Sequence, residues 1–306
     1  ATTAVVLAGG WAGSLYLDAK YHFRKDLQAL STQKRAQKEY ARVVKDNKVS
    51  LFYVLEETCK KRWNQEAIWS REKTYTYGEL YEKTIRYAQL MISEGVQPKE
   101  LVAMNLINSP HFYFVWLAAV AVGAAPAFIN YNLEGKGLVH CLKVSEARLM
   151  IADEDEACQQ RLNGSRADIE AMGTKIIVLD DRLKDLITSR EAKRPGDELR
   201  SGVKGEDPFS SIYTSGTTGL PKGCAFTFQR IYSGMALNIP ICECVPGVDR
   251  LYNAMPLYHG TGGINSMVCL LQGVSVALAP KFSVSKFWDD IHKSQSTGFI
   301  YVGETS

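Results

Sequence analysis

Short apolar segments suited to β-strands alternate with helical segments along most of this chain. The segments expected to be strands are 101–107, 124–129, 148–152, 175–179, 209–213, 251–254, 274–279 and 298–302. The segments expected to be helices include 111–122, 134–144, 229–238, 262–271 and 285–293. Alternation of this kind brings successive strands side by side, with the helices packed over them. The pattern therefore predicts an α/β fold of mostly parallel sheets flanked by helices.

Local sequence signals indicate where individual helices begin and end. Thr76 and Glu79 have the spacing of a capping box, so a helix is expected to open there and to stop at Gly95. The apolar run 111–122 is shorter than the roughly 20 residues that span a bilayer, which favours a helix of the core. The polar residues 181–207 predict a solvated connection ahead of the next strand.

Composition indicates a globular protein. The chain has 306 residues, of which 46% are hydrophobic and 23% charged, and its net charge of +3 is too small to argue for nucleic-acid binding. Its seven cysteines are scattered, and Cys242 and Cys244 form the closest pair. That spacing is not C-x-x-C, so we expect reduced thiols in a cytosol-facing protein and neither a disulfide framework nor a zinc site.

Residues 213–223 read Tyr-Thr-Ser-Gly-Thr-Thr-Gly-Leu-Pro-Lys-Gly and follow a predicted strand. Glycines let the backbone approach an anion closely, hydroxyl and N–H groups donate hydrogen bonds, and the lysine adds a positive charge. The run therefore predicts a phosphate-binding loop, with a Ser/Gly-rich surface loop as the alternative. It is not the common nucleotide P-loop, because Gly223 follows Lys222 where that motif has a serine or threonine.

Residues 255–263 read Met-Pro-Leu-Tyr-His-Gly-Thr-Gly-Gly and form the second informative segment. They follow a short predicted strand, and ligands bind at the carboxyl ends of strands in open α/β sheets. An imidazole at such a position can orient or hydrogen-bond a carboxylate near neutral pH. His259 is therefore a candidate site residue, with a purely structural histidine as the alternative.

The run 214–223 resembles the signature loop of the adenylate-forming (AMP-binding) superfamily. Members activate a carboxylate with ATP and Mg²⁺ to give an acyl-adenylate and pyrophosphate, and the adenylate usually acylates coenzyme A. The resemblance implies the N-terminal part of the large domain of that fold, with ATP, Mg²⁺ and coenzyme A as cofactors. The phosphate-binding residues that it implies are Thr214, Ser215, Gly216, Thr217, Thr218, Gly219, Lys222 and Gly223. His259 matches the histidine that borders the carboxylate, which makes it the catalytic candidate.

Residues 281–290 and 301–304 are similar to the fatty acid transport protein / very-long-chain acyl-CoA synthetase branch of that superfamily, and residues 17–20 fit it less specifically. The branch implies a fatty-acid–CoA ligase that activates long- and very-long-chain fatty acids, coupled to fatty acid uptake. Glu304 is assigned no metal role, because the order of the residues around it differs from the family's Mg²⁺-binding motif.

Residues 1–48 are expected to form a membrane-associated basic segment ahead of a partial AMP-binding domain over 49–306. They carry nine Lys and Arg against four Asp and Glu, and their apolar stretch over 4–17 is too short to span a bilayer. Basic residues suit an anionic cytosolic leaflet. The expected location is the cytosolic face of the endoplasmic reticulum, peroxisome, lipid droplet or plasma membrane. The alternative is an apolar helix packed on the domain.

The chain is expected to be an incomplete enzyme, truncated before the C-terminal domain. The family's adenine, ribose, Mg²⁺ and coenzyme A residues have no counterpart up to Ser306. Two other functions stay open at this point. One is a CoA ligase for a different carboxylic acid, and the other is a non-catalytic membrane protein that binds or transports lipid. The oligomeric state stays undetermined.

Overall fold

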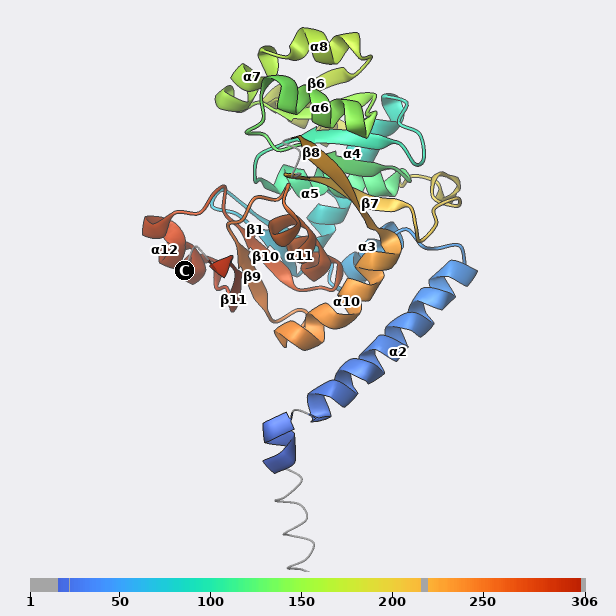
Figure 1. Ribbon diagram of the computed structural model, residues 1–306, viewed down its shortest axis with the longest axis vertical. Helices are drawn as coiled ribbons and strands as arrows, with labels where there is room; N and C mark the ends of the chain where they lie inside the picture. Colours follow the sequence, from blue (N-terminus) through green and yellow to red (C-terminus); the bar gives the residue numbers. More distant parts are fainter. Residues whose placement is uncertain (1–15, 22, 216–219, 304–306) are drawn as a thin grey trace, which may run out of the picture.

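Two sheets form the framework of the protein (Figure 1). The structure is a computed structural model that describes residues 16–21, 23–215 and 220–303. The larger sheet has the strand order β6 (Lys175–Leu179), β5 (Leu149–Asp153), β3 (Leu101–Asn105), β4 (Ala125–Phe128), β7 (Pro208–Ser215) and β8 (Pro221–Thr227). The smaller sheet has the order β11 (Gly298–Ile300), β9 (Arg250–Asn253), β10 (Ser275–Leu278), β1 (Glu66–Trp69) and β2 (Thr74–Thr76).

Helices precede, connect and cover these strands. The helices are α2 (Phe23–Lys45), α3 (Phe52–Lys61), α4 (Tyr77–Ser93), α5 (Pro110–Ala121), α6 (Gly135–Ser145), α7 (Glu156–Asn163), α8 (Arg166–Ala171), α9 (Asp181–Ser189), the 3-10 helix η1 (Asp197–Leu199), α10 (Phe228–Cys242), α11 (Gly260–Leu271) and α12 (Val284–Ser294). Among the described strand pairs, β1–β2 and β7–β8 are antiparallel and the others are parallel. The predicted α/β fold with mostly parallel sheets is confirmed.

Helix α4 has the ends that the sequence predicts. The Thr76 hydroxyl accepts a hydrogen bond from the N–H of Glu79 at 3.1 Å, and the Glu79 carboxylate accepts one from the N–H of Thr76 at 2.9 Å. This reciprocal pair satisfies two of the N–H groups that a helix start leaves unpaired. Gly95 follows the helix with a φ of +70°, a left-handed conformation that favours glycine.

Helix α5 is the centre of the main core. Residues 112–122 are all buried, which agrees with the prediction of a core helix. The Trp116 ring lies 4.6 Å from the ring of Phe128 and 5.1 Å from that of Phe209, so it packs against β4 and β7. On another side of α5, the Tyr113 hydroxyl donates to Ser266 of α11 at 2.7 Å. Helix α5 thus connects the larger sheet to the helix that follows the 255–263 turn.

The predicted connection over 181–207 is solvent-exposed along much of its length, but it contains regular structure and a buried side chain that the prediction lacked. Helix α9 and the 3-10 helix η1 occupy parts of it, and the side chain of Arg200 is fully buried. The Arg200 guanidinium donates hydrogen bonds to the carbonyls of Ala121 and Pro195. It also pairs with Asp197 at 2.7 Å. Its two Nη groups satisfy carbonyls that would otherwise be unpaired, including the last one of α5, whereas its Nε has no hydrogen-bond partner among the described residues.

Helix α2 contacts the body of the protein near its C-terminal end and extends away from it at the other end (Figure 1). The ring of Tyr40 lies 5.4 Å from that of Tyr232 on α10. Within residues 16–21, 23–215 and 220–303, no helix combines the length and the apolar character needed to cross a bilayer. Residues 1–15, which hold most of the predicted apolar stretch, lie outside the described residues, so the membrane role of 1–48 stays a prediction.

Candidate active site

The predicted phosphate-binding run begins and ends on the two paired strands of a β-hairpin, β7 and β8. Its first residues end β7, and its last residues begin β8, a strand that the sequence did not predict. Thr214 is paired directly opposite Lys222 across the hairpin, and both are exposed. Of the other predicted phosphate-binding residues, Gly223 lies on β8. The group Gly216, Thr217, Thr218 and Gly219, together with the side chain of Ser215, lies outside the described part of the chain.

Neighbouring elements hold the base of the hairpin. On α6, the Nε2 atom of His140 lies 3.0 Å from the carbonyl oxygen of Pro221. A Cβ placed on Gly223 would lie 3.5 Å from Cγ1 of Val144 and 3.6 Å from the ring of Tyr213, which is ordinary van der Waals contact. Burial raises the pKa of Tyr213 to about 12, which keeps its hydroxyl protonated near neutral pH. The exposed Thr214 and Lys222, which we call the tip of the hairpin, thus lie beyond a base that contacts α6.

His259 occupies the N-cap position of α11. Its backbone is extended, and its Nδ1 accepts a hydrogen bond from the N–H of Thr261 at 3.3 Å. In a neutral imidazole whose Nδ1 is the acceptor, Nε2 carries the proton and is the donor. The ring is exposed. Nε2–H is thus a hydrogen-bond donor at the positive end of a helix dipole, where a carboxylate would be favoured.

The turn before His259 folds back tightly on the first turn of α11. A Cβ placed on Gly262 would lie 2.4 Å from the carbonyl oxygen of Pro256, and one on Gly263 would lie 2.1 Å from that of Leu257. Both positions therefore require glycine for close approach of the backbone, not for an unusual φ. The two glycines of the motif have a steric role, which the sequence alone did not distinguish from a ligand-binding one.

Two buried asparagines connect this turn to the surrounding strands, and no sequence pattern indicates either of them. Asn108 donates to the carbonyl of Met255 at 2.9 Å and accepts from the N–H of Leu257 at 2.8 Å. Asn108 also donates to the carbonyl of Ala279, just after β10, at 3.2 Å. Asn253 accepts from the N–H of Met255 at 2.9 Å and donates to the carbonyl of Gly262 at 3.0 Å. They hold both sides of the turn that ends in His259.

The hairpin and the His259 turn meet at the start of α11. A Cβ placed on Gly260 would lie 3.6 Å from Cδ1 of Ile212 on β7 and 3.6 Å from Cζ of Phe226 on β8. The two predicted motifs, which are separated in the sequence by α10 and β9, therefore belong to one region. Gly260, the residue after His259, thus lies against side chains from both strands of the hairpin.

An apolar cavity of about 620 Å³ adjoins the same turn. Met255 and Pro256 form part of its wall, and Asn108 and Tyr131 contribute further lining. The rest of its lining comes mainly from the ends of strands β9, β10 and β11 and from α12, namely Tyr252, Ala254, Pro280, Lys281, Phe282, Phe287, Phe299, Ile300 and Tyr301. The volume lies within the range of roughly 300–1,000 Å³ that small-molecule sites occupy.

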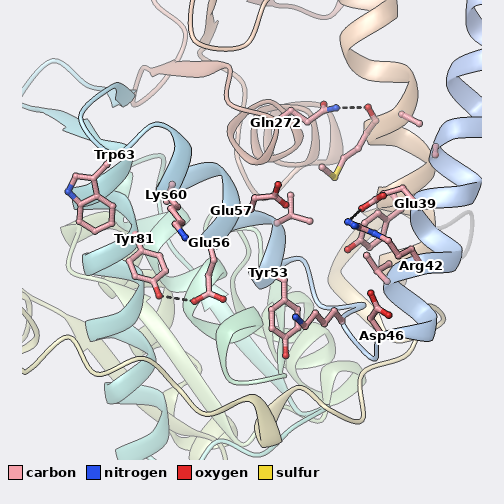
Figure 2. Close-up of a pocket in the computed structure, with 18 residues that line it drawn as sticks. Glu39, Arg42, Asp46, Tyr53, Glu56, Glu57, Lys60, Trp63, Tyr81 and Gln272 are labelled. Atoms are coloured by element: carbon pink, nitrogen blue, oxygen red, sulfur yellow. Dashed lines mark hydrogen bonds and ion pairs between the residues drawn. The ribbon is translucent and has the colours of Figure 1, made fainter.

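A larger cavity of about 1040 Å³ lies elsewhere, among α2, α3 and α10 (Figure 2). Two pairs of its polar side chains are engaged with each other. The Tyr81 hydroxyl donates to Glu56 at 2.8 Å, and Arg42 pairs with Glu39 at 2.5 Å. Of the predicted site residues that the structure describes, Thr214, Lys222, Gly223 and His259 are all absent from its lining. Volume alone therefore does not identify the candidate active site.

Comparisons with known proteins agree with the two motifs. A family model described as "AMP-binding enzyme" matches residues 55–305. "Isopenicillin N epimerase component 1" of Hapsidospora chrysogena is 38% identical, over 99% of this chain and 45% of its own length. "Very long-chain fatty acid transport protein" of Cochliobolus heterostrophus is 34% identical, over 97% of this chain and 46% of its own.

The fold is also that of a solved structure. "Mycobacterium tuberculosis fatty acyl CoA synthetase" superposes with a TM-score of 0.73 at 22% identity, over 83% of this chain and 49% of that one. At this identity the likeness establishes the fold and nothing more. The chain spans about half the length of the curated relatives it matches.

Proposed function

Because this chain belongs to the AMP-binding enzyme family, we propose that it carries the phosphate-holding and carboxylate-positioning parts of a fatty-acid–CoA ligase. The reaction begins when a carboxylate oxygen attacks the α-phosphorus of ATP. The bond from that phosphorus to the bridging oxygen breaks, pyrophosphate leaves and an acyl-adenylate forms. The thiol of coenzyme A then displaces AMP to give the acyl-CoA. The proposed acids are long- and very-long-chain fatty acids.

The hairpin tip is the proposed phosphate site. The glycines and hydroxyls of Thr214 to Gly219, with Gly223, would hold the phosphate oxygens. Lys222, opposite Thr214, would balance the charge that develops on the departing pyrophosphate. Fixed donors and a fixed positive charge stabilise such a transition state because they need no rearrangement as the charge forms. The exposure of Thr214 and Lys222 on neighbouring strands supports this assignment.

His259 is the proposed carboxylate-positioning group. The observation that carries the whole proposal is that the start of α11 lies against β7 and β8, with Gly260 beside Ile212 and Phe226. A carboxylate held by Nε2–H of His259 would thus be close to a nucleotide whose phosphates occupy the hairpin. The aromatic cavity beside Met255 and Pro256 supports an apolar substituent on the acid.

Mg²⁺ and coenzyme A are proposed as part of the complete reaction. Among the described residues, no three His, Cys, Asp or Glu side chains are grouped as metal ligands would be. This part of the chain supplies no carboxylate cage for Mg²⁺, so we assign no step to the ion. No described residue is assigned to coenzyme A either.

We further propose that the protein acts at the cytosolic face of a membrane in support of fatty acid uptake. The basic residues of 1–48 and a relative named as a very long-chain fatty acid transport protein support this location. The endoplasmic reticulum, peroxisome, lipid droplet and plasma membrane are the candidate membranes. Residues 1–48 as the membrane-associated segment and 49–306 as the AMP-binding part remain the proposed division.

The test is ATP binding and fatty-acid-dependent ATP–pyrophosphate exchange by the full protein carrying Lys222→Ala. We expect exchange to fall by about a hundredfold, the effect of removing one preorganised charge from a transition state. Lys143→Ala removes an exposed lysine from the neighbouring helix α6 and should leave exchange unchanged. Equal exchange by the wild-type and Lys222→Ala proteins would contradict the phosphate assignment.

A ligase for a different acid is the second candidate, and the relative named isopenicillin N epimerase component 1 favours it. A panel of fatty, aromatic, bile and amino acids in the exchange assay distinguishes the two. The fatty-acid proposal requires the highest kcat/KM with long acyl chains. A protein that binds fatty acid but shows no exchange with any acid would instead be a non-catalytic lipid-binding protein.

A further inference from the structure

The two faces of the β7–β8 hairpin carry different residues. Side chains alternate between the faces along a strand, and residues directly opposite each other in an antiparallel pair share a face. Lys222 is paired with Thr214, and two residues further along the strands Cys224 is paired with Ile212. These four residues therefore lie on one face, which we call the front of the hairpin.

The front of the hairpin is the face that meets the start of α11. A Cβ placed on Gly260 would lie 3.6 Å from Cδ1 of Ile212 and 3.6 Å from Cζ of Phe226. Phe226 belongs to the front as well, because it lies four residues from Lys222 on the same strand. The side chain of Lys222 therefore leaves the hairpin on the face that lies against the residue after His259.

Helix α6 packs against β8 (Figure 1). Nε2 of His140 lies 3.0 Å from the carbonyl oxygen of Pro221. One turn further along α6, Cγ1 of Val144 would lie 3.5 Å from a Cβ placed on Gly223, in van der Waals contact. Residues four apart lie on the same face of a helix. One face of α6 thus contacts β8 immediately before and immediately after Lys222.

The contact between His140 and Pro221 is a hydrogen bond whose direction follows from its acceptor. A carbonyl oxygen can only accept, so Nε2 of His140 carries the proton and donates it. Proline has no backbone N–H, so the carbonyl is the one backbone group with which Pro221 can form a hydrogen bond. The half-buried imidazole of His140 therefore engages the whole backbone hydrogen-bonding capacity of the residue that precedes Lys222.

Helix α6 is itself packed on the larger sheet. Leu138, Cys141 and Leu142 are buried in a hydrophobic cluster with Ala103 of β3 and Met150 of β5. A side chain of this helix is therefore attached to the interior of the protein, which is close-packed and moves little. The hydrogen bond from His140 connects the start of β8 to that interior.

We propose that His140 is a positioning residue for Lys222. Its hydrogen bond holds the first residue of β8 on α6 and so keeps the ammonium group of Lys222 on the front of the hairpin. His140 touches neither the phosphates nor the acid, and it acts through the backbone of Pro221. The inference rests on the proposed function, because the charge that Lys222 balances is that of the nucleotide phosphates. A misplaced charge loses much of its effect on a bound phosphate.

Two substitutions in the full protein separate the hydrogen bond from the ring. His140→Gln keeps an N–H donor near the position of Nε2, whereas the shorter side chain of His140→Asn places its donor near the position of Nδ1. We expect His140→Asn to raise the KM for ATP in pyrophosphate exchange roughly tenfold, and His140→Gln to stay within about twofold of the wild type. Lys143→Ala, at an exposed position of the same helix, is the control and should leave this KM unchanged.

The KM for ATP distinguishes positioning from a loss of folded protein. Partial unfolding lowers the amount of active enzyme, and so the apparent kcat, but it leaves the KM for ATP of the remaining enzyme unchanged. The KM for the fatty acid should be the same in all these proteins. A wild-type KM for ATP in His140→Asn would overturn the proposal.

A double-mutant comparison shows whether His140 acts through Lys222. In Lys222→Ala the ammonium group is already absent, so the addition of His140→Asn should cause no further loss of kcat/KM for ATP. In the wild-type background the same substitution should cause a loss of roughly tenfold. Equal losses in both backgrounds would mean that His140 acts independently of Lys222, and would overturn the proposal.

Hydrogen–deuterium exchange separates this inference from the proposed function, because it needs no ATP. The amides of residues 222–227 should exchange faster in His140→Asn than in the wild type, and His140→Gln should restore their protection. Unchanged protection of β8 in His140→Asn would refute the positioning role. If β8 responds as expected but the wild type shows no pyrophosphate exchange with any acid, the proposed function alone fails.

Discussion

The hairpin tip at Thr214 and Lys222 and the turn at His259 contribute to the same proposed site in different ways. The tip is exposed and carries its polar groups on adjacent residues of one motif. The turn is held by buried asparagines and by glycines whose neighbours leave no room for a side chain. The difference teaches that one half of the site depends on local chemistry and the other on distant packing. Mutations should therefore separate function from stability at the tip and couple them at the turn.

The largest effect is expected at Gly263. In Gly263→Ala, the new Cβ would lie 2.1 Å from the carbonyl oxygen of Leu257, so the turn must move. We expect the free energy of unfolding to fall by about 4 kcal/mol, as for severe overpacking, measured by urea denaturation. Gly234→Ala in α10 is the control, since a Cβ there meets nothing within 4 Å; it should stabilise the helix by about 0.5–1 kcal/mol. A mild Gly263→Ala phenotype would show that the turn is not tightly packed.

Acid should lower the stability of the folded protein through His111, which lies in the first turn of α5, three residues after Asn108. Burial, with the neighbouring charges of Lys184 and Lys83, lowers its pKa from 6.5 to about 4. The unfolded chain therefore binds a proton that the folded protein refuses, and stability falls as pH drops from about 6.5 to about 4. The loss from this one group amounts to about 3 kcal/mol.

Thermal unfolding of the wild-type and His111→Gln proteins between pH 7 and pH 4 measures this loss of stability. As the pH falls over that interval, the wild type should lose more stability than His111→Gln. Parallel curves for the wild-type and His111→Gln proteins would contradict the assignment.

Asn108→Ala should lower the free energy of unfolding by about 2 kcal/mol, because it leaves the buried carbonyl of Met255 and the N–H of Leu257 without a partner. We also expect pyrophosphate exchange to fall more than stability alone would explain, since His259 follows this segment. Chemical denaturation and exchange assays on the same protein provide both values. Asn163→Ala, at an exposed position, should change stability by less than about 0.5 kcal/mol. Normal exchange in Asn108→Ala would show that the hydrogen bonds of Asn108 do not position His259.

Of these substitutions, Lys222→Ala should change the stability of the protein least. Its side chain is exposed, so we expect the free energy of unfolding to change by less than about 0.5 kcal/mol. Loss of ATP binding without loss of stability would be the clearest sign that the tip acts locally. A Lys222→Ala protein that unfolds more easily than Asn108→Ala would show that the tip, and not the turn, depends on distant packing.

Elements with strong local signals were predictable, and those stabilised by distant contacts were not. The capping box at Thr76 and the apolar segments of β3 to β6 and α5 are where the sequence places them. Strand β8 has no strand signal in the sequence, because the motif that opens it has the composition of a loop and its pairing with β7 exists only in three dimensions. Strands β1 and β2 and helices α7 and α8 were not predicted. Helix α9 was missed because its surface is mostly polar.

The sequence by itself determined the α/β class, the family and the identity of the chemical groups. Those properties follow from periodicity and from short motifs, which act through adjacent residues. Only the tertiary structure decided that His259 lies beside the hairpin, that Asn108 and Asn253 hold its turn, and that Arg200 is buried. These depend on contacts between residues far apart in the chain. Such contacts arise from the packing of two sheets around α5, and no local pattern specifies them.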